Sequence, residues 1–85
     1  MSRIEINKNN KHYEVIVSDY RAGTRIVYDV TDMRYSKKYN MIILYNDKTD
    51  IGTISLDSPE DRIIWDPEDF DISIRNAVEH LERGC

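Results

Sequence analysis

Apolar and polar positions alternate along the first two-thirds of the chain. In residues 12–17 the apolar side chains Tyr13, Val15 and Val17 share one face, and residues 25–30 repeat this period of two. A period of two is what a β-strand with one buried face requires. Both segments are therefore predicted to be strands.

Polar, turn-forming segments separate the β-prone runs. Residues 7–11 contain three asparagines, which tolerate the left-handed backbone of tight hairpins and predict a first hairpin. Residues 46–50 are all polar and join two β-prone runs, so they predict a second hairpin. A last short strand is expected at 62–65. Residues 31–40 fit a bulged strand, a single helical turn or an open loop.

The C-terminal segment carries the pattern of an amphipathic helix. Asp66 is a good N-cap, Pro67 suits the first helical position, and the acids that follow favour a helix N-terminus. Five apolar residues recur at helical spacing and form one stripe: Phe70, Ile74, Ala77, Val78 and Leu81. We predict a helix over about 67–83, with a start delayed to Asp71 as the alternative.

These elements predict an α+β fold. We expect one domain over residues 1–85, in which an antiparallel meander of five to six strands (about 3–65) is closed by the C-terminal helix. The helix stripe would cover the buried face of the sheet. The same order of elements also fits a small barrel.

Length and composition limit the function classes. Eighty-five residues build one thin core. The longest apolar run, residues 41–45, is far shorter than the roughly 20 residues of a membrane span. The N-terminus has no secretory signal, and the single cysteine, Cys85, cannot close an internal disulfide. We expect a cytoplasmic protein that makes no membrane contact.

The sequence offers no catalytic or metal-binding motif. His12 and His80 have no serine or cysteine nucleophile motif near them. One cysteine and two histidines are too few for a zinc site, and residues 66–77 lack the glycine and glutamate of a calcium loop. We predict a non-enzymatic protein without cofactor or metal and with little room for a substrate pocket. An enzymatic role would require two carboxylates, or His12 and a carboxylate, to meet in a cleft.

Charge is segregated along the chain, whose net charge is −4. Residues 1–40 hold eight Lys or Arg against five Asp or Glu, whereas residues 41–85 hold four against eleven. The acidic stretch 57–71 also contains Trp65 and Phe70, which are either core residues or surface anchors. Aromatic anchors within a charged rim are typical of protein docking surfaces. The predicted partner-binding residues are Asp57, Glu60, Asp61, Trp65, Glu68 and Asp69.

A basic, tyrosine-rich stretch over residues 20–39 supports a second interpretation. Cations along a nucleic-acid backbone and aromatic rings stacked on bases bind single strands. The residues for this alternative are Arg21, Arg25, Arg34, Tyr35, Lys37, Lys38 and Tyr39. The acidic total charge opposes this interpretation.

We therefore expect a small acidic protein that docks onto a partner protein with a basic surface. Stand-alone acidic proteins of this size are often inhibitors carried by phages or mobile elements, so an inhibitory or regulatory role is expected. Nucleic-acid binding is the alternative. Self-association into a homodimer is compatible with both, because a meander leaves two edge strands.

Overall fold

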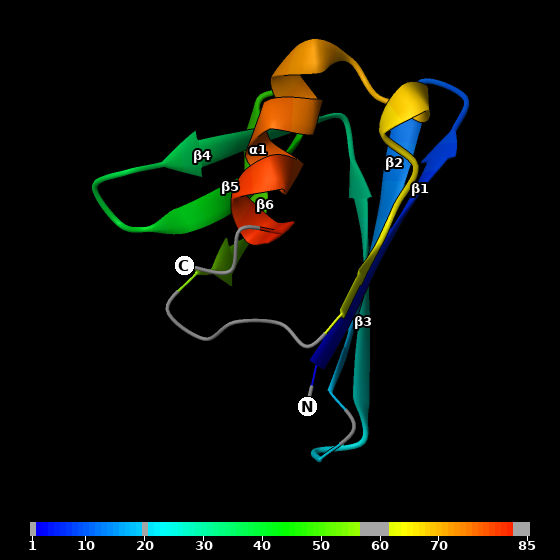
Figure 1. Cartoon of the computed structure of the whole chain (residues 1–85), viewed down its shortest axis with the longest axis vertical. Helices are drawn as coiled ribbons and strands as arrows, with labels where there is room; N and C mark the ends of the chain where they lie inside the picture. Colours follow the sequence, from blue (N-terminus) through cyan, green and yellow to red (C-terminus); the bar gives the residue numbers. More distant parts are fainter. Residues whose placement is uncertain (1, 20, 57–61, 83–85) are drawn as a thin grey trace.

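The computed structural model describes residues 2–19, 21–56 and 62–82. In that part of the chain, seven strands precede a single 3-10 turn and one α-helix (Figure 1). In chain order they are β1 (Ser2–Asn9), β2 (His12–Asp19), β3 (Thr24–Val30), β4 (Asp32–Ser36), β5 (Met41–Asn46), β6 (Thr49–Ser55), β7 (Arg62–Ile64), η1 (Pro67–Asp69) and α1 (Ile72–Glu82). The α+β class, with mostly β structure and a C-terminal helix, is confirmed.

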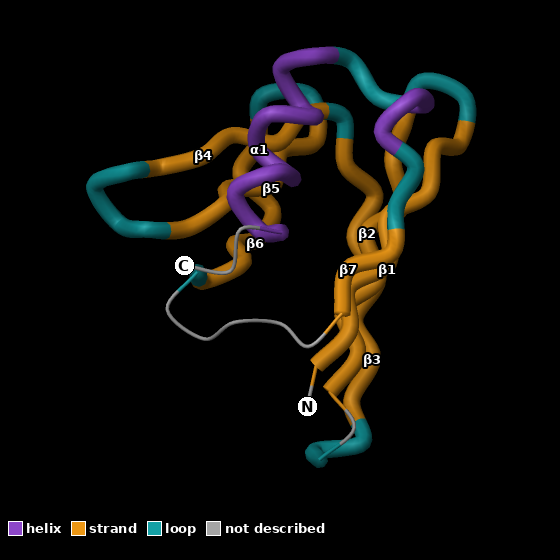
Figure 2. The backbone as a smooth tube through the Cα atoms, in the orientation of Figure 1, coloured by secondary structure: helices purple, strands orange, loops and turns teal. Residues whose placement is uncertain are grey.

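The strands form two open sheets. One has the order β3-β2-β1-β7 and the other the order β4-β5-β6, and α1 lies across the shorter sheet (Figure 2). Neighbouring strands are antiparallel except β1 and β7, which run parallel. The predictions of five to six strands, of one antiparallel meander and of a barrel are therefore wrong.

The chain changes sheet at Thr31. Buried residues of one regular strand lie an even number of positions apart. Val30 and Met33 are both buried but lie three positions apart, so the buried face shifts by one residue between β3 and β4. The Thr31 amide donates to the Tyr45 carbonyl (2.8 Å), and the Thr31 hydroxyl accepts from the Asp47 amide (2.8 Å). This corner contains neither glycine nor proline, which is why the sequence pattern predicts one continuous sheet.

The turns follow the predicted chemistry more closely. Asn10 in the first hairpin has a φ of 58°, in the left-handed region that asparagine tolerates. The second hairpin turns through only two residues, Asp47 and Lys48, both with positive φ. Residues 31–40, which the sequence leaves open, form a corner, β4 and the turn that leads to β5.

The C-terminal helix starts later than its principal prediction. Asp66 does act as an N-cap, because its carboxylate accepts from the Glu68 amide (3.1 Å), but the turn that it caps is the 3-10 turn η1. Phe70 then takes an extended backbone (φ −113°, ψ 142°) and turns its ring into the core. The α-helix begins only at Ile72, so the delayed start is the better description.

Both sheets and the helix meet in one hydrophobic core. Its buried members come from six strands, from the segment after β6 and from the C-terminal region: Ile4, Ile6, Tyr13, Val15, Val30, Met33, Ile42, Leu44, Ile54, Leu56, Phe70, Ile74, Ala77, Val78 and Leu81. The ring of Phe70 stacks on Tyr13 (4.7 Å between centroids) and meets Trp65 edge-on (5.2 Å). The edge strands are β3 and β7 in the long sheet and β4 and β6 in the shorter one.

Candidate binding surface

The acidic stretch is only partly within the described residues. Asp57, Glu60 and Asp61 lie outside them, whereas Glu68 and Asp69 are exposed on η1. Trp65 is half-buried and packs against the core through Phe70. Trp65 therefore has a structural role, and docking through the acidic stretch stays a prediction.

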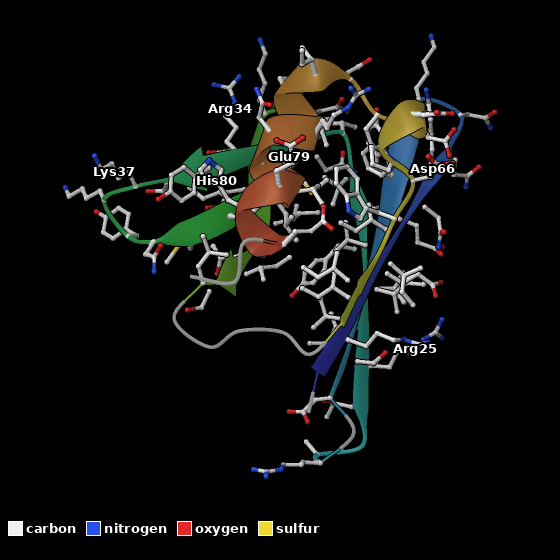
Figure 3. The ribbon with its side chains drawn as sticks, viewed as in Figure 1. Arg25, Arg34, Lys37, Asp66, Glu79 and His80 are labelled. Carbon is white, nitrogen blue, oxygen red and sulfur yellow. The ribbon has the colours of Figure 1, made fainter. Side chains whose placement is uncertain are left out.

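The basic stretch is divided between two distant places. Arg21 and Arg25 belong to the β2–β3 hairpin, and Arg25 lies on the long sheet, far from Lys37 at the tip of the β4–β5 hairpin (Figure 3). The structure brings together the other five residues of the alternative site on that hairpin: Arg34, Tyr35, Lys37, Lys38 and Tyr39. The seven predicted residues therefore do not form one surface.

A groove of about 420 Å³ runs along β4 beside α1. Four consecutive residues of the strand line it, Asp32 to Tyr35. Successive side chains of a strand point to opposite faces, so only a hollow at the strand edge can touch four in a row. The groove is therefore an edge groove, and β4 is an edge strand of its sheet. Its volume contradicts our expectation of little room for a pocket.

The opposite wall of the groove is a stripe of α1. Ser73, Asn76, Ala77 and His80 recur at spacings of three, one and three, which places them on one side of the helix. The His80 ring stacks on Tyr35, with centroids 3.8 Å apart and 14° between the ring planes. This contact joins the helix to β4 and orients both rings at the groove. The groove residues of α1 are not predicted from the sequence. Their polar members, Ser73, Asn76 and His80, lie beside the apolar stripe of the helix at helical spacing.

The side-chain carboxylate of Asp32 occupies the open side of β4. Asp32 accepts from the Met33 amide (2.9 Å) through one oxygen and from Arg34 Nε (3.0 Å) through the other. The Met33 amide is thus directed away from β5. The hydrogen bond to Asp32, and then the charge of Asp32, raise the pKa of the Arg34 guanidinium above its ordinary value.

The tip of the β4–β5 hairpin extends the groove with cations and an aromatic ring. Lys37 and Lys38 are exposed, and Tyr39 has 58 % of its surface accessible. The Lys38 ammonium lies 5.2 Å from the centroid of the Tyr39 ring. Ser36 holds the turn, because its hydroxyl accepts from the Tyr39 amide (3.4 Å). A cationic, aromatic tip therefore adjoins the strand edge.

A second hollow, of about 300 Å³, contains His12 and a carboxylate. His12 Nδ1 lies 2.9 Å from Asp29 Oδ1, and Glu14 also lines the hollow. This is the arrangement that an enzymatic role would require. Both side chains of the pair are widely exposed (42 and 67 %), so water is not excluded. The lining residues include no serine, threonine or cysteine, and the absence of enzymatic activity remains our prediction.

Within residues 2–19, 21–56 and 62–82, no three His, Cys, Asp or Glu side chains gather closely enough to hold a metal ion. The one helix described, α1, is too short and too polar to cross a bilayer.

Comparison of the chain with models of protein families, with curated proteins and with solved structures found no match.

Proposed function

We propose that this protein is a non-enzymatic binding module that takes an extended acidic segment of a partner protein into the groove between β4 and α1. The observation that supports this proposal is that the edge strand β4 lines one side of the groove and polar residues of α1 line the other. Strand edges bind extended peptides through main-chain hydrogen bonds, and flanking pockets select alternate side chains. By holding such a segment, the protein would inhibit or regulate its partner.

The groove has the parts that strand addition needs. The Met33 amide points to the open side, where the Asp32 carboxylate now occupies the place of an incoming carbonyl. Alternation along β4 gives the Tyr35 amide the same direction. The helix stripe supplies polar groups from Ser73, Asn76 and His80. A bound segment would therefore replace the Asp32 contact with main-chain hydrogen bonds.

Charge favours an acidic occupant. Arg34 borders the groove with 73 % of its side chain exposed, and Lys37 and Lys38 follow at the hairpin tip. Residues 31–40 carry these three cations against one acid, Asp32. An acidic segment that displaces Asp32 from Arg34 would gain the guanidinium as a partner. This partner differs from the basic one expected from the acidic stretch, whose role stays a separate prediction.

The test is a selection of random displayed dodecapeptides on the immobilised protein. We expect enrichment of sequences with acids at alternate positions, and loss of this enrichment on Asn76→Trp, which fills the groove from the helix side. Ile72→Trp is the matched control, because Ile72 is on the same helix, is 72 % exposed and does not line the groove. Equal enrichment on Asn76→Trp, or none on the unmodified protein, would reject the proposal.

Single-stranded nucleic acid is the second candidate occupant. The exposed ring of Tyr39 next to Lys38 is the observation that favours it, since bases stack on such rings. Fluorescence anisotropy with a labelled twelve-nucleotide oligothymidylate separates the two candidates. Micromolar binding that weakens steeply between 50 and 200 mM salt, and is lost in Tyr39→Ala, would favour nucleic acid, following the release of counterions from phosphates (roughly tenfold or more over this range).

A further inference from the structure

The edge of β3 has the features of a surface that pairs with another strand. Thr24–Val30 forms the outer strand of the long sheet, and its first four residues are all exposed. Ile26 and Val27 are 49 and 50 % accessible on opposite faces of the strand. An edge strand of β-branched residues with apolar surface on both sides favours strand pairing. The Asp29 carbonyl of this strand accepts from Asn46 Nδ2 (3.0 Å), and its second lone pair remains for an incoming amide. This edge lies on a different sheet from the groove of the proposed function.

A second copy of the chain is the partner that the residues of β3 fit. A closed dimer relates two edge strands by a two-fold axis, so the strands run antiparallel. The same faces of the two sheets then continue into each other, and the axis passes beside one residue that opposes itself. Near the middle of the strand that residue is Ile26, Val27 or the half-buried Tyr28.

Charge selects one of the three registers. With Val27 on the axis, Arg25 of each copy opposes Asp29 of the other, so two ion pairs form on one face. On the other face Ile26 opposes Tyr28. With Ile26 or Tyr28 on the axis, Arg25 opposes an uncharged residue instead. Among the described residues, the Arg25 side chain forms no ion pair or hydrogen bond that this contact would displace.

The hollow around His12 supplies the receiving site for Arg25. It spans β2 and β3 and borders the edge strand, because Val27, Tyr28 and Asp29 line it together with His12 and Glu14. Glu14, which pairs with Asp29 across the ladder, contributes a second carboxylate. Asp29 uses one oxygen for His12, and its side chain is 67 % exposed, so another oxygen can accept from a guanidinium.

We propose that the chain forms a symmetric homodimer through antiparallel pairing of β3 with β3 of a second copy, centred on Val27, with Arg25 of each copy in the carboxylate hollow of the other. The two long sheets then become one continuous sheet across the dimer. Each copy keeps its β4 groove open, because the groove lies on the other sheet. The dimer does not depend on the proposed peptide binding.

Charge reversal tests this pairing directly in sedimentation equilibrium at several protein concentrations. We expect a concentration-dependent dimer whose dissociation constant rises at least tenfold in Arg25→Asp and in Asp29→Arg, because each change places like charges opposite each other. The double variant Arg25→Asp/Asp29→Arg restores the pairs with reversed sign and should return to within threefold of the unmodified chain. Arg21→Asp, in the turn outside the paired residues, is the control of equal charge change and should leave the dimer unchanged.

A monomer at all concentrations, an unaffected single variant, or a double variant without recovery would overturn the proposal. A cross-link provides a second readout if a charge variant fails to fold. In a Cys85→Ser background, Val27→Cys places two thiols beside the axis, where opposed Cα atoms are about 4.5–5.5 Å apart, within disulfide range. Mild oxidation should give a covalent dimer, whereas Thr53→Cys, exposed on β6, should not. Equal cross-linking of the two variants would contradict the register.

Discussion

Gly52 faces the ring of Tyr28 from the other sheet, and replacing it with alanine should destabilise the fold. The glycine lies on β6 beneath the ring of Tyr28 from β3. A Cβ atom at residue 52 would lie 2.7 Å from Tyr28 Cε1, 3.1 Å from Cζ and 3.3 Å from Cδ1. Carbon atoms in favourable contact are about 3.5–4.0 Å apart, so the ring or the sheet must move.

The expected cost follows from this overlap. Overpacking costs about 1–3 kcal/mol, and alanine recovers about 0.5–1 kcal/mol because glycine in a strand interior is unfavourable. The net cost is therefore at most about 2.5 kcal/mol, and it is smallest if the half-buried Tyr28 ring swings aside. For a domain of this size, each kcal/mol lowers the melting temperature by roughly 4–8 °C. We expect Gly52→Ala to unfold at lower urea concentration with an unchanged m-value, measured by circular dichroism.

A double-mutant cycle with Tyr28→Ser isolates the contact. Removal of the ring removes the three atoms nearest to the added methyl group of Gly52→Ala, so the substitution should become neutral or slightly stabilising. The measurements are made at low protein concentration, because Tyr28 also belongs to the proposed dimer strand. An equal effect of Gly52→Ala in both backgrounds would show that the ring does not set the cost.

Three further substitutions and one control test the described contacts by urea unfolding. Ile74→Ala should cost about 2–5 kcal/mol because Ile74 is 3 % exposed in the core, whereas Ile72→Ala, at 72 % exposure on the same helix, should change stability by less than about 0.5 kcal/mol. Asp66→Ala removes the acceptor of the Glu68 amide and should cost about 0.5–2 kcal/mol, and a neutral result would deny that Asp66 acts as a cap. Thr31→Val removes the hydroxyl at the corner between the sheets and should cost about 1–3 kcal/mol, unless the corner is held by its backbone alone.

The sequence pattern predicts the local elements better than their assembly. Alternation identifies the strands around Val15 and Tyr28 because each has one face against the core. Asn10 and Asp66 act as turn and cap residues through interactions with nearby backbone, so their roles are readable without the fold. The parallel partner of β1 is not readable in this way, because nothing in residues 62–64 specifies which edge they will join.

The candidate surface depends on contacts between distant residues, and this limits its prediction. Tyr35 and Lys38 are predicted as candidate binding residues from the basic, tyrosine-rich stretch in which they lie. His80 joins them only because α1 crosses the sheet at β4, which places its ring on Tyr35. Arg25 lies away from this surface, because the corner at Thr31 places β3 and the β4–β5 hairpin in different sheets. Proximity in sequence is thus a poor guide to shared surface where a chain changes sheet.

The parallel pairing of β1 with β7 joins residues 59 positions apart, such as Arg3 and Arg62. Hairpins close short loops quickly, whereas a contact of this span carries a larger loss of chain entropy that only an assembled core can offset. We therefore expect β1 and β7 to pair late during folding and to separate early during unfolding. During ribosomal synthesis, one side of β1 should therefore stay unpaired until β7 has been made and released from the ribosome.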